Sequence, residues 1–285
     1  MKNIIFVLFI AVCSSSFAQM PVPKQADLNS FLKTTTLVII DENNTEMMEF
    51  YESLKASVEK YWKITPYEFI SLEDFDVRKK EKNNSYLMLT EISMQADDAM
   101  VKYNFISLLL GSTRTLQTMP ELANAPLSYY GLEEETFVFK VPALVMSIQN
   151  HINVLKDNPN LDSDKKLMLF YHKNIAAIKG MVLYVAQPDL APDANTADKI
   201  KTVYPYECKI ISYEELSNMV KNPPANAIFL HKMGPAGTKN KTGRCTKMVM
   251  GASDAKLYYF DYHDINDKNP DGFMLKDFKK LSKND

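Results

Sequence analysis

The sequence predicts an α/β protein built from two tandem copies of a βαβαβ-type module, each with a mixed sheet and trailing antiparallel strands. Two observations support this fold class. A set of short segments recurs in the same order, with a separation of 141 positions between Phe69 and Ile210. In both halves, apolar runs typical of strands alternate with segments of helical periodicity, which is the pattern of a sheet with crossover helices.

The repeat is clearest in one segment of each half. Residues 69–75 (FISLEDF) and 210–216 (IISYEEL) share the pattern apolar, Ile, Ser, apolar, acidic, acidic, apolar. Three further pairs keep the same order along the chain: 37–40 with 182–185, 86–90 with 227–231, and 110–113 with 250–253. Several matches in one order indicate an internal duplication.

Each copy opens with an apolar run that predicts a buried strand, at residues 36–40 and 181–185. A helix is expected next, and its pattern is weaker in the second copy, at residues 195–203. In the first copy the apolar positions recur at three- and four-residue steps, namely at Met47, Phe50, Leu54 and Val58.

The later elements also occur in matching pairs. Further strands are predicted at 67–70, 86–92, 104–110 and 127–130 in the first copy, and at 208–211, 227–231, 247–250 and 257–260 in the second. Each copy should end in a helix, at 143–155 and 275–281. The charged stretch 156–162 is the expected linker between the copies.

A serine follows the second strand of each copy and precedes an acidic pair. Ser71 and Ser212 each have a carboxylate three residues later, Asp74 and Glu215, as in a helix capping box. We therefore interpret these acidic residues as helix caps. The alternative is a paired-carboxylate active site.

Composition argues against several function classes. The net charge is −2, with no overall basic excess, so nucleic acid is not an expected partner. The chain has 8 glycines and neither of the common phosphate-binding glycine patterns, so no nucleotide cofactor is expected, and no other cofactor is predicted.

The N-terminus has the parts of an export signal. Lys2 precedes an apolar run at residues 4–13, and residues 16–18 (SFA) predict cleavage after Ala18. An apolar run of about ten residues is shorter than the ~20 that a membrane span needs, so no transmembrane segment is expected in the mature chain. We predict a periplasmic or secreted protein. The alternatives are a buried N-terminal strand and a lipoprotein modified at Cys13.

Cleavage would leave two cysteines, Cys208 and Cys245. An oxidising compartment permits a disulfide. The favoured interpretation is two separate buried thiols, because a free cysteine packs as a small apolar residue.

A basic, glycine-containing stretch at residues 232–247 has no acidic residue. Within it, Lys239, Lys241 and Arg244 are candidate binding residues for an anionic ligand or an acidic envelope protein. The alternative is a solvated loop whose glycines serve turn geometry. The corresponding stretch of the first copy, 91–102, is acidic, so the two loops could pair if the copies dock.

A second candidate site is the stretch 267–272 (DKNPDG), in which Asp267, Asn269 and Asp271 match the opening of a calcium-binding loop. Phe278 stands at the twelfth position, where a bidentate Glu is expected. The alternative is therefore a turn that leads into the last helix.

Three segments resemble a group of uncharacterised exported proteins from Bacteroidota. They are residues 60–69 (KYWKITPYEF), 103–111 (YNFISLLLG) and 126–130 (PLSYY), and the FAQ end of the signal adds to the likeness. The resemblance covers most of the mature chain. It implies export and assigns no activity.

These observations favour a non-catalytic exported envelope protein that binds a protein or a small ligand through its duplicated module. The alternative is an enzyme that acts on envelope or extracellular polymers, with a site between the repeats, because catalytic groups can converge from distant positions. The predicted organisation is a signal peptide at 1–18, an extension at 19–33, and repeats at 34–160 and 161–285.

Overall fold

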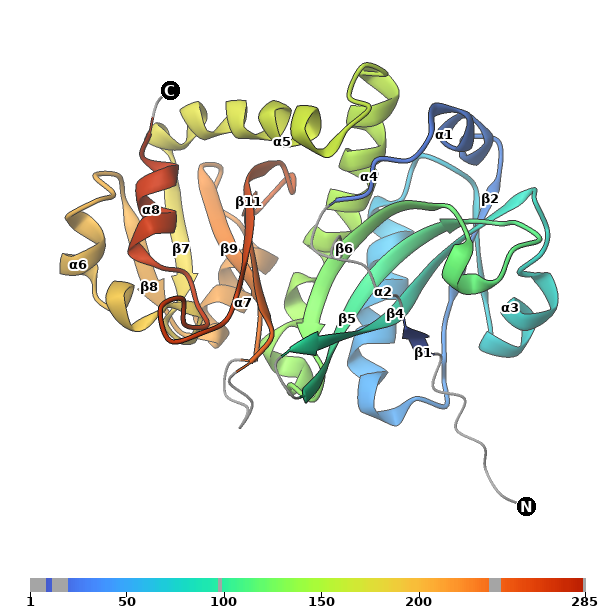
Figure 1. Cartoon of the computed structure of the whole chain (residues 1–285), viewed down its shortest axis with the longest axis horizontal. Helices are drawn as coiled ribbons and strands as arrows, with labels where there is room; N and C mark the ends of the chain where they lie inside the picture. The colour runs from blue at the N-terminus through green and yellow to red at the C-terminus, as the bar shows by residue number, and fades with distance from the viewer. Residues whose placement is uncertain (1–8, 12–19, 97–98, 236–241, 284–285) are drawn as a thin grey trace.

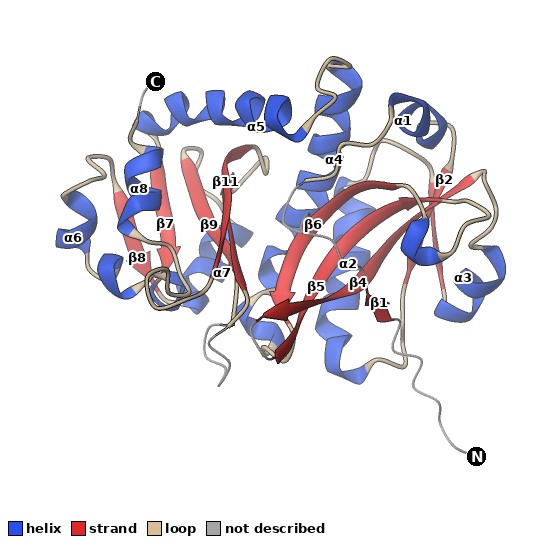
Figure 2. Ribbon diagram, in the orientation of Figure 1, coloured by secondary structure: helices blue, strands red, loops and turns tan. Residues whose placement is uncertain are grey.

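Two mixed β-sheets lie side by side in the computed structural model of the chain, and helices flank each of them (Figures 1 and 2). The structure describes residues 9–11, 20–96, 99–235 and 242–283. The strand order is β3-β2-β4-β5-β6 in the first sheet and β8-β7-β9-β10-β11 in the second. The two orders correspond strand for strand, which confirms the predicted tandem α/β modules.

The first module runs from β2 to α4. Its strands are β2 (Thr35–Ile39), β3 (Tyr67–Ile70), β4 (Asn84–Ala96), β5 (Ala99–Leu110) and β6 (Glu121–Tyr129). Its helices are α2 (Met48–Tyr61), α3 (Leu72–Arg78) and α4 (Val141–Asp157), and the short 3₁₀ segment η4 (Val138–Lys140) precedes α4. Helix α1 (Gln25–Phe31) lies ahead of β2.

The second module runs from β7 to α8. Its strands are β7 (Val182–Ala186), β8 (Cys208–Ile211), β9 (Ala227–Met233), β10 (Arg244–Gly251) and β11 (Leu257–Asp264). Its helices are α6 (Ala197–Lys201), α7 (Tyr213–Lys221) and α8 (Leu275–Leu281). Helix α5 (Asp164–His172) and the 3₁₀ segment η5 (Lys173–Gly180) connect the modules.

Strand directions follow the same plan in both sheets. β2 is parallel to β3 and β4, and β7 is parallel to β8 and β9. The later strands pair antiparallel, β4 with β5 and β5 with β6, and β9 with β10 and β10 with β11. Both sheets are therefore mixed, with the trailing antiparallel strands that the short connections predict.

The serines after β3 and β8 are helix caps, as predicted. Ser71 Oγ accepts a hydrogen bond from the Asp74 backbone N–H at 3.0 Å, at the start of α3. Ser212 Oγ accepts one from the Glu215 N–H at 3.1 Å, and Glu215 Oε2 accepts the Ser212 N–H in return at 2.8 Å. Ser71 thus caps α3 through its side chain, whereas α7 has a full capping box in which the Glu215 carboxylate takes part.

Several elements extend beyond the predicted bounds, most of all β4 and β5, which cover Asn84–Ala96 and Ala99–Leu110 where 86–92 and 104–110 were predicted, and two further differences concern β6 and α5. β6 begins at Glu121, six residues before the predicted strand. The prediction missed this first part because it contains Pro126, which lacks a backbone N–H and argues against a strand. The β5–β6 register shifts next to this proline, so a bulge accommodates it. Helix α5 was not predicted, because it buries just two side chains, Leu167 and Tyr171, and leaves little periodic signal.

One apolar core joins the two modules. The largest cluster of buried apolar side chains includes Val38 and Leu87 from the first sheet, Leu144 from α4, and Phe229 and Met248 from the second sheet. The opposite face of each sheet has a smaller cluster of its own. The halves therefore pack as one body, which the sequence alone left open.

Residues ahead of β2 are anchored to α4 by a buried histidine. His151 Nε2 lies 2.8 Å from the Pro21 carbonyl oxygen, and His151 Nδ1 lies 2.9 Å from the Tyr171 hydroxyl oxygen on α5. A carbonyl can only accept, so Nε2 carries the proton and Nδ1 accepts from Tyr171. Burial lowers the pKa of His151 to about 4, so this imidazole is neutral at pH 7.

Part of the predicted signal peptide forms a strand. Residues Phe9–Ala11 (β1) pair in parallel with β4 at Glu91–Ser93. The cleavage site at residues 16–18 and Cys13 lie outside the described residues, so cleavage after Ala18 stays a prediction. Across the described ranges, none of the helices has the length and apolar character to cross a membrane.

The two cysteines of the second module are separate free thiols, as favoured from the sequence, but only Cys245 is buried and Cys208 is half-buried. Cys208 is on β8 and Cys245 is on β10, with β7 and β9 between these strands. Three strand spacings of ~4.8 Å separate the two strands by roughly 14 Å, and Cys245 also lies six residues along β10 from Gly251, the residue level with Cys208, so the two Cα atoms are further apart than that. A disulfide needs a Cα–Cα distance below about 7 Å, so the cysteines cannot bridge.

We expect His151 to make folding stability pH-dependent. The unfolded chain binds a proton at this residue near pH 6.5, whereas the folded chain does so near pH 4, so its stabilising contribution is complete above pH 6.5 and is lost as the pH falls toward 4. Between about pH 7.5 and about pH 4.5 the wild type should lose roughly 2 to 3 kcal/mol more unfolding free energy than His151→Gln.

Urea unfolding at both pH values measures this difference. His172→Gln, at an exposed position on the neighbouring helix, is the matched control and should keep the wild-type pH dependence. Equal pH dependence of the wild type and His151→Gln would contradict the assignment.

Candidate functional site

Charged side chains gather at the carboxyl ends of the parallel strands of the second sheet. Asp189 follows β7, Tyr213 opens α7 after β8, and Lys232 lies near the end of β9. Ligand sites of α/β sheets commonly form at this edge, where the strand order reverses. Lys140, from η4 of the first module, reaches the same place.

Buried contacts connect these residues across the two modules. The Tyr213 hydroxyl donates to Asp189 Oδ1 at 2.7 Å, and Lys140 Nζ lies 3.7 Å from Asp189 Oδ2. Lys232 Nζ donates to Asp271 Oδ2 at 2.5 Å. The Lys140 and Asp189 side chains are 2% and 1% exposed, so a substrate in solution cannot reach this pair.

The pKa values of the two lysines in this cluster, Lys140 and Lys232, shift in opposite directions. Burial lowers the pKa of Lys140, and Asp189 compensates only in part. For Lys232, burial also acts to lower the pKa, but the charges of Asp271 and Asp189 outweigh it and raise the pKa above its usual value. Lys232 is therefore a fixed positive charge held between carboxylates.

A buried histidine completes the contact between the modules. His231 Nε2 lies 2.7 Å from the Pro126 carbonyl oxygen on β6, so Nε2 carries the proton and donates. Burial and the nearby charge of Lys140 lower its pKa to about 3. Nδ1 has no hydrogen-bond partner among the described residues. The bulge at Pro126 thus offers a carbonyl to the second module.

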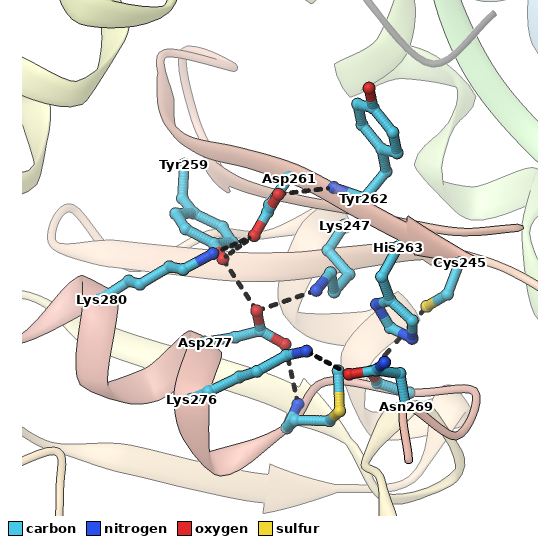
Figure 3. Close-up of polar contacts among 12 residues, drawn as sticks. Cys245, Lys247, Tyr259, Asp261, Tyr262, His263, Asn269, Lys276, Asp277 and Lys280 are labelled. Carbon is cyan, nitrogen blue, oxygen red and sulfur yellow. Dashed lines mark hydrogen bonds and ion pairs between the residues drawn. The ribbon is translucent and has the colours of Figure 1, made fainter. Parts of the chain in front are cut away.

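A second buried ionic cluster lies between the second sheet and α8 (Figure 3). Lys247 Nζ and Asp277 Oδ1 are 2.8 Å apart, and both side chains are 0% exposed. The Tyr259 hydroxyl lies 2.9 Å from both Asp277 Oδ1 and Asp261 Oδ2. Asp277 Oδ2 accepts the Met274 N–H at 2.9 Å, so this carboxylate has partners on both oxygens and fixes α8 on the sheet.

Cys245 and His263 lie side by side on neighbouring strands of the same region (Figure 3). Burial raises the pKa of Cys245 to about 12, so the thiol is not ionised at pH 7. His263 Nε2 lies 2.9 Å from the Pro270 carbonyl oxygen, and its Nδ1 is not bonded to any described residue. No hydrogen bond between Cys245 and His263 is formed in this part of the structure. An activated thiol would need such a base and a lowered pKa.

The residues of the calcium-like stretch are engaged by lysines. Asp271 bonds Lys232, and Asn269 Oδ1 accepts from Lys276 Nζ at 2.6 Å. Asp267 is exposed in the preceding turn. Among the residues that the structure describes, no group of three or more His, Cys, Asp or Glu side chains is placed to hold a metal ion. The geometry gives the calcium hypothesis no support.

The basic stretch between β9 and β10 is held tightly at both ends. At Gly234 an added Cβ would lie 2.2 Å from Asp271 Oδ1, and at Gly243, with φ +123°, it would lie 2.3 Å from the Tyr103 hydroxyl oxygen. That hydroxyl accepts the Arg244 backbone N–H at 2.5 Å. Tyr103 belongs to β5, so this end is bound to the first module.

Of the three predicted basic residues, only Arg244 lies within the described part of the chain. Its Nε donates to Asp264 Oδ1 at 2.9 Å, and its guanidinium lies 4.7 Å from the centre of the Tyr262 ring. The side chain is 13% exposed, so Arg244 mainly holds β10 to β11. Lys239 and Lys241 lie outside the described residues.

A shallow apolar depression opens beside Arg244, where the β4–β5 hairpin meets the β9–β10 hairpin. We call it the seam depression, and its lining residues are Ile92, Met94, Tyr103, Phe105, Met233, Arg244 and Thr246. Its enclosed volume is about 10 Å³. A cavity needs ~10–15 Å³ to hold one water molecule, so the depression is a shallow apolar surface feature and not an enclosed ligand pocket.

One polar atom in the seam depression is left without a partner. Thr246 is 2% exposed, and its Oγ1 makes no hydrogen bond with any described residue. A buried hydroxyl without a hydrogen bond is destabilising by about 1–3 kcal/mol.

Sequence reasoning did not identify Lys140, Asp189 or Tyr213. Asp189 and Tyr213 had a usable signal, because each directly follows a predicted parallel strand, at the edge where such sites form. Lys140 had none, because its position depends on how the modules dock. The seam depression had none either, since its walls come from four strands of two modules.

We expect the ion pair between Lys247 and Asp277 to be essential for stability. Asp277→Asn keeps an acceptor for the Met274 N–H but leaves the Lys247 charge buried without a counter-charge, which should lower the unfolding free energy by about 3–5 kcal/mol. Urea unfolding measures the loss. Asp267→Asn makes the same chemical change at an exposed turn and should stay within about 0.5 kcal/mol of wild type. Similar values for both variants would show that the pair is dispensable.

Glycine at position 243 should also be required. Gly243→Ala places a Cβ against Tyr103 at a φ of +123°, and we expect a loss of about 1–3 kcal/mol in unfolding free energy. Gly180→Ala is the matched control, because no atom lies within 4 Å of the new Cβ there. Thermal unfolding of both variants gives the comparison, and an unchanged midpoint for Gly243→Ala would contradict the close contact.

Comparisons of the chain with protein-family models, with curated protein sequences and with solved structures found no match. The resemblance to exported proteins of Bacteroidota therefore stays a prediction. The function is argued from the geometry above.

Proposed function

We propose that this chain is a non-catalytic exported envelope protein that binds another protein at the seam depression. The observation that carries the proposal is an apolar depression with an unsatisfied buried hydroxyl, Thr246 Oγ1, at the meeting point of the two modules. Its shallowness favours contact with the surface of a partner protein over an enclosed small molecule.

The charged clusters support a binding protein more than an enzyme. The alternative, an enzyme acting on envelope or extracellular polymers, would find its best residues in Lys140, Asp189 and Tyr213 between the repeats. Lys140 and Asp189 are almost fully buried, and a polymer substrate needs exposed catalytic groups. Lys247 and Asp277 are completely buried and hold α8 in place.

The basic stretch between β9 and β10 predicts that the partner is negatively charged. Of the basic residues in 232–247, Lys232, Lys247 and Arg244 pair with Asp271, Asp277 and Asp264, so the expectation of an acidic partner rests on the sequence positions of Lys239 and Lys241. A partner with acidic residues around an apolar side chain would complement this surface. Export to the periplasm or beyond belongs to the same proposal, and it rests on the N-terminal sequence.

The test is affinity capture from cross-linked envelope fractions, followed by mass spectrometry. We expect a stoichiometric partner with the wild type and its loss with Met94→Glu, which puts a charge in the depression. Met100→Glu is the matched control, because Met100 is 58% exposed and lies outside the lining of the depression.

Charge reversal at Lys239 and Lys241 tests the basic stretch separately and should weaken capture. Equal capture by the wild type and by Met94→Glu would show that the partner binds at a surface other than the seam depression. Capture of nothing specific by the wild type would reject the proposed function.

A further inference from the structure

Strand β4 has a long outer edge that β2 covers only in part. β2 pairs with β4 from Asn84 to Leu87, whereas β5 covers the other edge from Ser85 to Ala96. Among the described strands, the rest of the outer edge pairs with β1 alone, at Glu91–Ser93. The outer edge of the β4–β5 hairpin therefore accepts an added strand.

The backbone groups on this edge can be identified. The Asn84 carbonyl oxygen accepts the Gly111 N–H on the β5 side. Successive residues of a strand point their backbone groups to alternate edges, and the β4–β5 register shows no shift. Glu91 and Ser93 therefore turn their N–H and C=O groups toward β1.

Strand β1 would be absent from the mature protein if the predicted export signal is cleaved off. Cleavage after Ala18 would take away Phe9–Ala11 and leave the Glu91 and Ser93 backbone groups without a strand partner. An open edge of this kind is a template for another strand. The same part of β4 lines the seam depression with Ile92 and Met94.

From this arrangement we infer that the bound segment of the partner is an extended apolar strand that adds in parallel to β4 at Glu91–Ser93. The direction follows from β1, which lies parallel there. The apolar character follows from the lining of the seam depression. Main-chain hydrogen bonds would supply affinity, and an apolar side chain opposite Ile92 would pack against Ile92 and Met94 beside the depression and supply specificity. The inference rests on the proposed function and names its binding mode.

The test uses the protein purified from the envelope after export, with its N-terminus read by mass spectrometry. The probe is a fluorescent peptide that carries residues 7–12 (VLFIAV) between lysines, which add solubility. We expect a mature N-terminus at Gln19 and saturable binding of the peptide. Ser93→Pro removes an outward N–H and leaves the bonds to β5, so it should weaken binding about tenfold or more. Met100→Glu, on the same hairpin, should bind as the wild type does.

A second measurement does not depend on the folding of the proline variant. Hydrogen exchange of the wild type should show that the peptide protects the amides of residues 89–94. Absence of binding, equal binding by Ser93→Pro, or a purified protein that retains Phe9–Ala11 would overturn strand addition.

The two proposals can fail separately. If the partner is still captured from the envelope but the peptide neither competes with it nor protects β4, the binding function stands and strand addition is wrong. If the peptide binds at β4 but no partner is captured, the edge is competent and the proposed function is wrong.

Discussion

Lys232 and Lys247 lie directly opposite each other on β9 and β10, and both are buried. Two like charges in this position repel, and each would be strongly destabilising without a carboxylate. The chain after β11 supplies both carboxylates, Asp271 to Lys232 and Asp277 to Lys247. The path of this last segment across the sheet is therefore set by electrostatics as well as by the apolar contacts of Phe273 and its neighbours.

The same constraint reaches the surface between the modules. Asp271 lies against Gly234 at the start of the β9–β10 loop, and Tyr103 of the first module lies against Gly243 at its end. The loop ends are thus fixed by a buried ion pair on one side and by a hydroxyl of the other module on the other. Met233 and Thr246, which line the seam depression, stand next to these two anchors.

Local signals in the sequence were enough for most of the fold. The apolar runs at 67–70, 208–211 and 275–281 match β3, β8 and α8 residue for residue, because these short elements begin and end at clear signals. The serine N-caps correctly predicted where α3 and α7 begin. Helix α5 and the start of β6 were not predicted, because α5 has few buried positions and the first part of β6 contains a proline at a bulge.

The candidate site was much less predictable. Arg244 was a candidate for binding an anionic ligand or partner, and its pairing with Asp264 depends on the register of β10 and β11, which no local pattern reveals. Asp271 was noticed as a possible calcium ligand, because its alternation with Asn269 looks the same in sequence whether the oxygens meet a cation or, as in this structure, lysines. Contacts between modules, such as Lys140 with Asp189, require the docked structure.

The shared apolar core has a consequence for how a duplicated gene can change. Once Leu144 and Phe229 pack in the same cluster, neither copy can be deleted or exchanged without exposing the face that the other covers. The two copies then evolve as complementary parts. The second has two buried lysines on its central strands, Lys232 and Lys247, where the first has none among the described residues of its corresponding strands β4 and β5, although the strand order of the two modules is the same.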